Sequence, residues 1–138
     1  MTIVAIGTPG PQGSKRFMGT RGGRGVLIES SKKVKPWREA VVWAAREAGG
    51  RVVGPVVVEM IFTLPKPKSA PKRRKLWPDR KPDLSKLVRS TEDALTDAGA
   101  WEDDARVVEL RTAKRYPGEG ADALDVPGCV IRIHEATA

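Results

Sequence analysis

Four short segments of the chain have the residue pattern of β-strands. Residues 2–7 (TIVAIG) and 55–64 (PVVVEMIFTL) are apolar and rich in β-branched side chains, which is typical of buried strands. Residues 105–116 (ARVVELRTAKRY) alternate between apolar and polar side chains, and residues 128–134 (GCVIRIH) form a last apolar run. Glu59 is the polar exception in the second strand and is expected to face either solvent or a site.

Two other segments repeat their apolar residues at helical spacing. One helix is expected over residues 36–48, where Pro36 suits the first turn and two glycines follow the end. A second helix is expected over residues 84–98, closed by Gly99. Its apolar face consists of Leu84, Val88, Thr91, Leu95 and Ala98, and the opposite stripe consists of Ser85, Arg89, Glu92 and Thr96. The apolar face is expected to pack on the sheet, and the polar stripe to face solvent or a cleft.

The order of these elements, β, α, β, α, β, β, predicts the fold class. The chain has 138 residues, of which 40% are apolar, enough for one modest core. We therefore expect a single α/β (α+β) domain over residues 1–138, with a mixed sheet of about four strands and two main helices.

Two segments between these elements are strongly basic. Residues 8–35 begin as a Gly- and Pro-rich loop carrying Lys15 and Arg16, followed by a glycine-rich tip and a short strand or hairpin arm. Residues 65–82 (PKPKSAPKRRKLWPDRKP) contain five prolines and eight Lys or Arg residues against one Asp, which predicts an extended, poorly packed loop. Trp77 in this loop either stacks on a base or anchors the loop, and we favour anchoring. The residues expected to contact nucleic acid are Lys15, Arg16, Lys72, Arg73, Arg74, Lys75, Arg80, Lys81 and Lys86.

The overall charge favours a polyanionic partner. The chain has 25 Lys and Arg residues against 17 Asp and Glu residues, a net charge of +8, which places nucleic acid first and an anionic membrane surface second. Cys129 and His134 are the only residues of their kinds, which excludes an intrachain disulfide and makes a Cys/His zinc site remote. No apolar run approaches membrane-spanning length, and residues 1–10 do not resemble a secretory signal, so we expect a soluble protein of the reducing cytoplasm.

Acidic residues bracket the second helix inside this basic chain. Asp83 lies at its beginning, and Asp103 and Asp104 lie just past its end. The helix spans roughly 20 Å, so these carboxylates meet only if the helix is short and bent or if the following strand returns beside Asp83. Singly, Asp83 is read as a helix cap, Asp103 and Asp104 as a turn, and Arg89 as the ion-pair partner of Glu92 or Asp93. As a set beside a basic surface, they indicate metal-dependent phosphodiester hydrolysis.

The same region carries a family pattern. It reads Lys81-Pro82-Asp83-Leu84-Ser85-Lys86-Leu87-Val88-Arg89, then Asp93-Ala94-Leu95, then Trp101-Glu102-Asp103-Asp104-Ala105-Arg106-Val107-Val108. This sequence resembles the RusA family of Holliday junction resolvases, most strongly over residues 81–116. The resemblance implies a small homodimeric α/β endonuclease that uses Mg²⁺, with Mn²⁺ as a substitute, to cut four-way junctions and other branched DNA by paired nicks. It also implies a role in recombination and repair, in a bacterial or phage-infected cell.

Carried over by position, the resemblance makes Asp83 and Asp104 metal-binding and catalytic residues, and Asp103 is a further candidate ligand. Two positions depart from the family pattern: Ser85 stands where the family has an aspartate, and Arg89 stands where a lysine is usual. Serine is a weak, neutral ligand, so another group has to complete the metal's coordination, with Asp103, Glu59 or Asp79 as candidates. Arg89 keeps the positive charge and is expected to stabilise the scissile phosphate.

Two rival functions remain open from the sequence. In the first, the chain keeps the fold and basic surface but has lost catalysis with Ser85, and it acts as a junction-binding architectural protein. In the second and weaker one, it is a general RNA-binding protein, which gives no reason for the spacing of Asp83 and Asp104.

Overall fold

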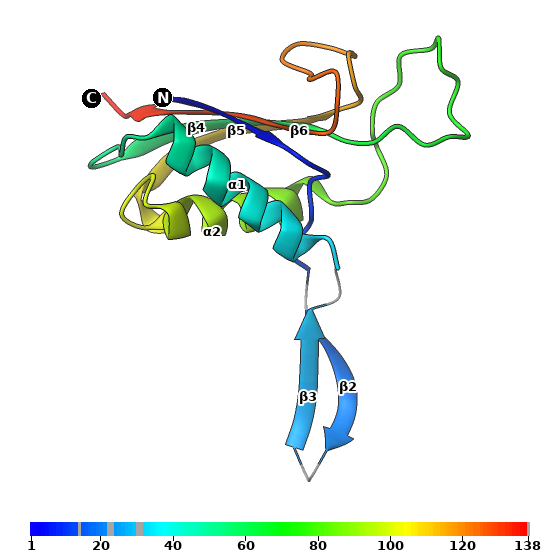
Figure 1. Ribbon diagram of the computed structural model, residues 1–138, viewed down its shortest axis with the longest axis horizontal. Helices are drawn as coiled ribbons and strands as arrows, with labels where there is room; N and C mark the ends of the chain where they lie inside the picture. The colour runs from blue at the N-terminus through cyan, green and yellow to red at the C-terminus, as the bar shows by residue number, and fades with distance from the viewer. Residues whose placement is uncertain (14, 22–23, 30–31, 138) are drawn as a thin grey trace.

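The structure is a computed structural model that describes residues 1–13, 15–21, 24–29 and 32–137. A four-stranded mixed sheet forms its centre, and both helices cover one face of that sheet (Figure 1). The elements of this body are β1 (Thr2–Ile6), α1 (Val34–Ala48), β4 (Val56–Thr63), α2 (Leu84–Ala98), the 3₁₀ turn η1 (Asp104–Arg106), β5 (Val107–Arg115) and β6 (Gly128–Glu135). The predicted α+β fold is thus confirmed, and α2 has the bounds expected from its periodicity.

The sheet has the strand order β1-β6-β4-β5, with β5 parallel to β4 and the other neighbouring pairs antiparallel. A parallel pair needs a crossover connection, and the segment containing α2 supplies it. Alternate residues of β4 point into the core, where Met60 and Phe62 are fully buried with Trp37 of α1 and Leu87 of α2. Packing of both helices on this face therefore fixes where the two ends of α2 lie.

The opposite face of the sheet carries Glu59. Its carboxylate pairs with Arg132 at 2.6 Å and with Arg111 at 3.4 Å. Because side chains alternate along a strand, Glu59 points away from the face on which α2 packs. The expectation that Glu59 completes an acidic site at α2 is therefore wrong.

The segment between β1 and α1 contains a hairpin of β2 (Lys15–Arg21) and β3 (Arg24–Glu29), which projects from the body near the start of α1 (Figure 1). Lys15 and Arg16 were expected in a loop but begin β2, because that segment pairs with β3. Their side chains lie outside the described part of the structure. In the ranges that the structure describes, no helix is long and apolar enough to cross a membrane.

Candidate functional site

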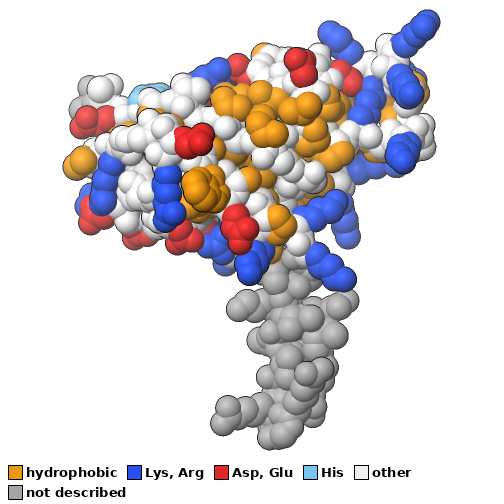
Figure 2. Space-filling model, viewed as in Figure 1, with side chains coloured by type: hydrophobic (Ala, Val, Ile, Leu, Met, Phe, Trp, Pro, Cys, Tyr) orange, Lys and Arg blue, Asp and Glu red, His pale blue; other side chains and the backbone are white. Residues whose placement is uncertain are grey.

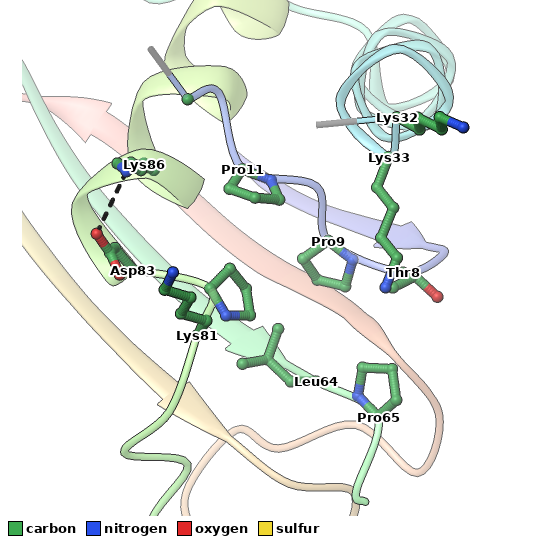
Figure 3. A pocket seen from close by; sticks show the side chains of 12 residues that line it. Thr8, Pro9, Pro11, Lys32, Lys33, Leu64, Pro65, Lys81, Asp83 and Lys86 are labelled. Atoms are coloured by element: carbon green, nitrogen blue, oxygen red, sulfur yellow. Dashed lines mark ion pairs between the residues drawn. The ribbon is translucent and has the colours of Figure 1, made fainter. Parts of the chain in front are cut away.

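Asp83 is the N-cap residue of α2, directly before the first turn of the helix. Its backbone is extended, and its carbonyl oxygen accepts hydrogen bonds from the backbone N–H groups of Lys86 and Leu87. Its carboxylate makes no capping hydrogen bond and lies 3.6 Å from the ammonium of Lys86 (Figure 3). Both side chains are about half exposed, at 53% and 46%, so the carboxylate of Asp83 remains accessible to a further cation.

A pocket of about 520 Å³ opens beside Asp83 (Figure 3). Its walls are mainly apolar, with prolines and Leu64, and its rim carries four lysines. The lining residues are Thr8, Pro9, Pro11, Gly13, Lys32, Lys33, Leu64, Pro65, Lys81, Pro82, Asp83 and Lys86. An apolar floor with ammonium groups at the rim suits the sugar and phosphate of a nucleic acid backbone.

The loop between β1 and the hairpin forms one wall of this pocket through a close backbone approach. A Cβ atom on Gly10 would lie 2.2 Å from the carbonyl oxygen of Lys33, so only glycine fits there. The Gly10 carbonyl also accepts a 2.6 Å hydrogen bond from the buried Ser90 hydroxyl of α2. Gly10 is thus required to bring this loop against both helices.

At the other end of α2, a chain of hydrogen bonds holds Asp104. The buried indole N–H of Trp101 donates to the Thr96 hydroxyl at 2.8 Å, and that hydroxyl donates to a carboxylate oxygen of Asp104. Asp104 begins the turn η1, while Asp103 precedes it with an exposed side chain. Of the two adjacent aspartates, Asp104 is therefore the one whose side chain is held in place by a hydrogen bond.

Two carboxylates of α2 interact with Asp104, and the sequence did not single them out. Burial raises the pKa of Glu92 to about 7, with further contributions from the negative charges of Asp104 and Asp93. Burial also raises the pKa of Asp93, against a hydrogen bond from the Gln12 side chain that lowers it. Glu92 lies one turn before Thr96, the residue that donates a hydrogen bond to Asp104, and this position places it near Asp104. The carboxyl end of α2 thus collects three mutually repelling carboxylates.

Ser85 and Arg89 are both exposed on α2. Arg89 forms no ion pair with any residue that the structure describes, so neither Glu92 nor Asp93 neutralises it there. Its guanidinium is available to an external anion, and its planar donors can bind two phosphate oxygens at once.

The structure does not bring Asp83 and Asp104 together within the chain. Thr96, the hydrogen-bond partner of Asp104, lies 13 residues after Asp83, roughly 20 Å along the helix. Strand β5 does return beside the beginning of α2, where the Lys114 ammonium donates to the Pro82 carbonyl at 3.0 Å. Asp104 precedes that strand and stays at the far end. Across the described ranges, no group of three or more His, Cys, Asp or Glu side chains is arranged to hold a metal ion.

The second basic segment, residues 65–82, has no regular helix or strand, as expected. Its predicted nucleic-acid contacts all have exposed side chains, and they join the exposed Lys86 of α2. These exposed residues are Lys72, Arg73, Arg74, Lys75, Arg80 and Lys81. Lysine and arginine side chains crowd the part of the surface where this loop lies (Figure 2). The two basic segments meet at the pocket, because Lys81 and Gly13 both line it.

The chain was compared with known proteins. A model of the endodeoxyribonuclease RusA family matches residues 7–126, which include both ends of α2, the pocket and both basic segments. A comparison with curated proteins found no match. Since the family model covers most of the 138 residues, this chain belongs to the RusA family of endodeoxyribonucleases.

Proposed function

We propose that the protein is a Mg²⁺-dependent, structure-selective endodeoxyribonuclease that resolves Holliday junctions and other branched DNA by paired nicks, as a homodimer, in recombination and repair. The observation that carries this proposal is the RusA family match over residues 7–126. Within that range, an accessible Asp83 lies beside a pocket lined by four lysines, and the carboxylates around Asp104 lie at the other end of α2. Carboxylates suit Mg²⁺, and the lysines and arginines suit a DNA backbone.

The carboxyl end of α2 fits a divalent cation by its chemistry. Burial and the negative charge of Asp104 raise the pKa of both Glu92 and Asp93, and a bound cation would favour their ionised forms. One subunit nevertheless supplies an incomplete site, because Asp83 lies at the other end of the helix. We therefore propose that Asp83 comes from the second subunit, with Asp103 beside Asp104 as an additional ligand.

The charge pattern of α2 supports this arrangement. Its first half exposes Lys86 and Arg89, while its second half carries Glu92 and Asp93. In a twofold dimer with antiparallel α2 helices, the basic half of each helix would face the acidic half of the other. The same symmetry would bring Asp83 of one subunit to Asp104 of its partner, twice per dimer, and two sites account for paired nicks.

Bound Mg²⁺ would activate a water molecule and stabilise negative charge on the scissile phosphate. The chain's own residues would position the reaction. Asp83 and Asp104 would hold the cation, Arg89 would bind the phosphate oxygens, and the lysines around the 520 Å³ pocket would hold the adjoining sugar-phosphate backbone. Recognition would depend on DNA shape, because backbone contacts carry no base sequence.

Mixing two inactive variants tests both the activity and the shared site. Asp83→Asn and Asp104→Asn alone should each fail to cut a synthetic four-way junction while still binding it. After the two are unfolded and refolded together, half of the dimers are mixed, and each mixed dimer has one intact and one doubly altered site. The mixture should therefore recover about a quarter of wild-type nicking, as single rather than paired nicks.

The outcomes separate the parts of the proposal. A mixture that stays inactive, with both single variants inactive, would place each metal site within one subunit. Unchanged cutting by Asp104→Asn would remove Asp104 from the mechanism. If the wild-type protein binds junctions but never cuts them with Mg²⁺ or Mn²⁺, this result would favour the architectural function. Two observations favour the same alternative, namely Ser85 and the incomplete metal site of a single chain in the part that the structure describes.

A further inference from the structure

The basic loop 65–82 is held to the body at two places, although it contains no helix or strand. At the first, the Lys66 ammonium donates to the Arg74 carbonyl at 2.9 Å and to the Glu119 carboxylate at 2.7 Å. The other oxygen of Glu119 accepts the backbone N–H of Leu76 at 2.9 Å. The Lys66 and Glu119 side chains are only 17% and 14% exposed, so this ion pair is a shielded clamp.

The second clamp holds the loop at Arg80, four residues after Leu76. The ammonium of Lys114, on β5, donates to the Arg80 carbonyl at 2.9 Å and to the Pro82 carbonyl at 3.0 Å. The two clamps fix the backbone on both sides of Trp77. The loop was expected to be poorly packed, but hydrogen bonds fix its backbone to the body on both sides of Trp77.

Trp77 itself is not used to anchor the loop, contrary to the interpretation favoured from the sequence. Its side chain is 75% exposed, and the Arg115 guanidinium lies over its ring, 5.7 Å from the ring centre. The Arg115 side chain packs closely against Gly120, where an added Cβ atom would lie 3.0 Å from the Cδ and Nε atoms of Arg115. The indole and the guanidinium thus form a pre-arranged pair of flat surfaces.

Hollows adjoin this pair. One of about 290 Å³ is lined by Lys75, Leu76, Trp77, Pro78, Arg115, Glu119, Gly120 and Ala121. Another, of about 370 Å³, is lined by Pro67, Ser69, Ala70, Pro71, Leu76, Trp77, Asp79, Arg80 and Tyr116. Trp77 is common to both, so its ring adjoins open space. Lysine and arginine side chains crowd the surface where the loop that carries it lies (Figure 2).

A flat aromatic side chain surrounded by cations suits one class of ligand. The cations attract phosphates, and an exposed indole gains free energy by stacking on a nucleobase. The bases of a continuous duplex are already stacked and paired, whereas bases at a branch point are the least constrained. We propose that Trp77 and Arg115 form a stacking platform for a nucleobase displaced at the branch point of the DNA. This inference deepens the proposed function and rests on it for the source of the displaced base.

Two exposed tryptophans make a matched test. Trp43 on α1 is 70% exposed and lies among side chains of both charges, so Trp43→Phe controls for the loss of an exposed indole. Tryptophan emission is measured without divalent cation while a four-way junction, a linear duplex or oligo(dT) is added. The wild type and Trp43→Phe should be quenched by the junction and by oligo(dT), and Trp77→Phe should lose most of that quenching.

Binding affinities complete the test. Trp77→Ala should weaken junction binding roughly 5- to 100-fold, as expected for one stacked base, and leave duplex binding unchanged. Trp77→Phe, which keeps an aromatic ring, should bind within a few-fold of wild type, and Arg115→Lys should fall between them. Equal junction affinity of Trp77→Ala and wild type, or equal losses on junction and duplex, would overturn the platform. Because oligo(dT) quenching does not depend on cutting, a protein that never cleaves junctions would refute the proposed function without removing the platform.

Discussion

The two ends of α2 differ in the charge that they carry and in what holds their side chains. At the amino end, an exposed Asp83 pairs with Lys86 beside a lysine-rimmed pocket. At the carboxyl end, Asp104 is held by hydrogen bonds through Thr96 to the buried Trp101, and two further carboxylates lie near it. Lysines are therefore concentrated at one end and carboxylates at the other, which is why we propose that the first binds phosphate and the second a cation.

This difference is the reason why we propose a site shared between two copies of the chain. Phosphodiester hydrolysis needs the cation and the phosphate within a few ångströms of each other, yet a rigid helix keeps these two ends apart. A second copy in the opposite orientation would remove that separation, and neither end would have to move. Substitutions at one end or the other test whether the two ends behave as a single site.

The largest effect is expected from removing the best-held carboxylate. Asp104→Asn should reduce junction cleavage at least about 10³-fold, because it removes a charged metal ligand without changing the side-chain volume. Asp97→Asn is the matched control at the same end of α2, since Asp97 pairs with Arg38 instead of joining Asp104. Cleavage and junction binding are measured in parallel. Equal losses of cleavage in both variants would mean that general charge, and not a site at Asp104, supports catalysis.

A smaller effect is expected from adding a carboxylate at the amino end. Ser85→Asp supplies a charged oxygen ligand two residues after Asp83, on the exposed side of α2. The Mg²⁺ concentration for half-maximal cleavage should fall by about tenfold, with little change in junction affinity. Ser85→Asn, which adds a neutral oxygen, is the control. A Mg²⁺ requirement that does not change would indicate that position 85 lies outside the metal site of this chain.

The sequence predicted the fold closely because its signals are local. Strand and helix periodicity and the glycine after α2 gave the bounds of α2 and the number of strands in the sheet. The start of α1 at Val34, before Pro36, was not foreseen, because proline is tolerated throughout the first turn, where backbone N–H groups need no partner. A short strand or hairpin arm was expected between residues 8 and 35, but Lys15 and Arg16, which begin β2, were assigned to the loop before it, since pairing of β2 with β3 is not a property of either segment alone.

The candidate site was less predictable because it depends on which groups meet in space. The sequence identified Asp83 and Asp104 as candidate metal ligands but did not give the distance between them. Strand β5 returns beside the beginning of α2, but the residue that it brings there is Lys114 and not Asp104. The roles of Glu92 and Trp101 depend on contacts with Asp104 that only the folded turn η1 creates. Trp77 was expected to anchor its loop, and instead hydrogen bonds made by Lys66, Glu119 and Lys114 do so.

A several-fold effect on DNA binding is expected from the basic end. Lys86→Ala removes a pocket-lining ammonium. The steepness of the plot of log affinity against log salt concentration should therefore fall by about 1, which corresponds to one lost phosphate contact. Arg46→Ala, in the last turn of α1, removes one positive charge away from the pocket and should leave the slope unchanged. The measurement is junction binding at several salt concentrations. Equal slopes for the two variants would show that the pocket does not hold phosphate.

The smallest effect concerns stability at the acidic end. The pKa of Glu92 is raised from 4.5 to about 7 in the folded protein, so the folded state binds more protons than the unfolded state between these values. The associated stability is therefore complete below about pH 4.5 and is lost as the pH rises through about 7. Glu92→Gln removes this ionisation and should be more stable than wild type at pH 8, by about 1 kcal/mol after allowance for solvent screening.

Denaturant unfolding from pH 4.5 to pH 8 in the presence of a chelator would measure this difference in free energy of unfolding. Glu39→Gln, on the exposed side of α1, loses the same formal charge and serves as the control. The wild type and Glu39→Gln should both lose stability as the pH rises, and Glu92→Gln should lose less. If all three profiles run parallel, then neither burial nor the charges of Asp104 and Asp93 raise the pKa of Glu92 in the folded protein. The proposed contrast between an anion-binding and a cation-binding end would then lose this energetic support.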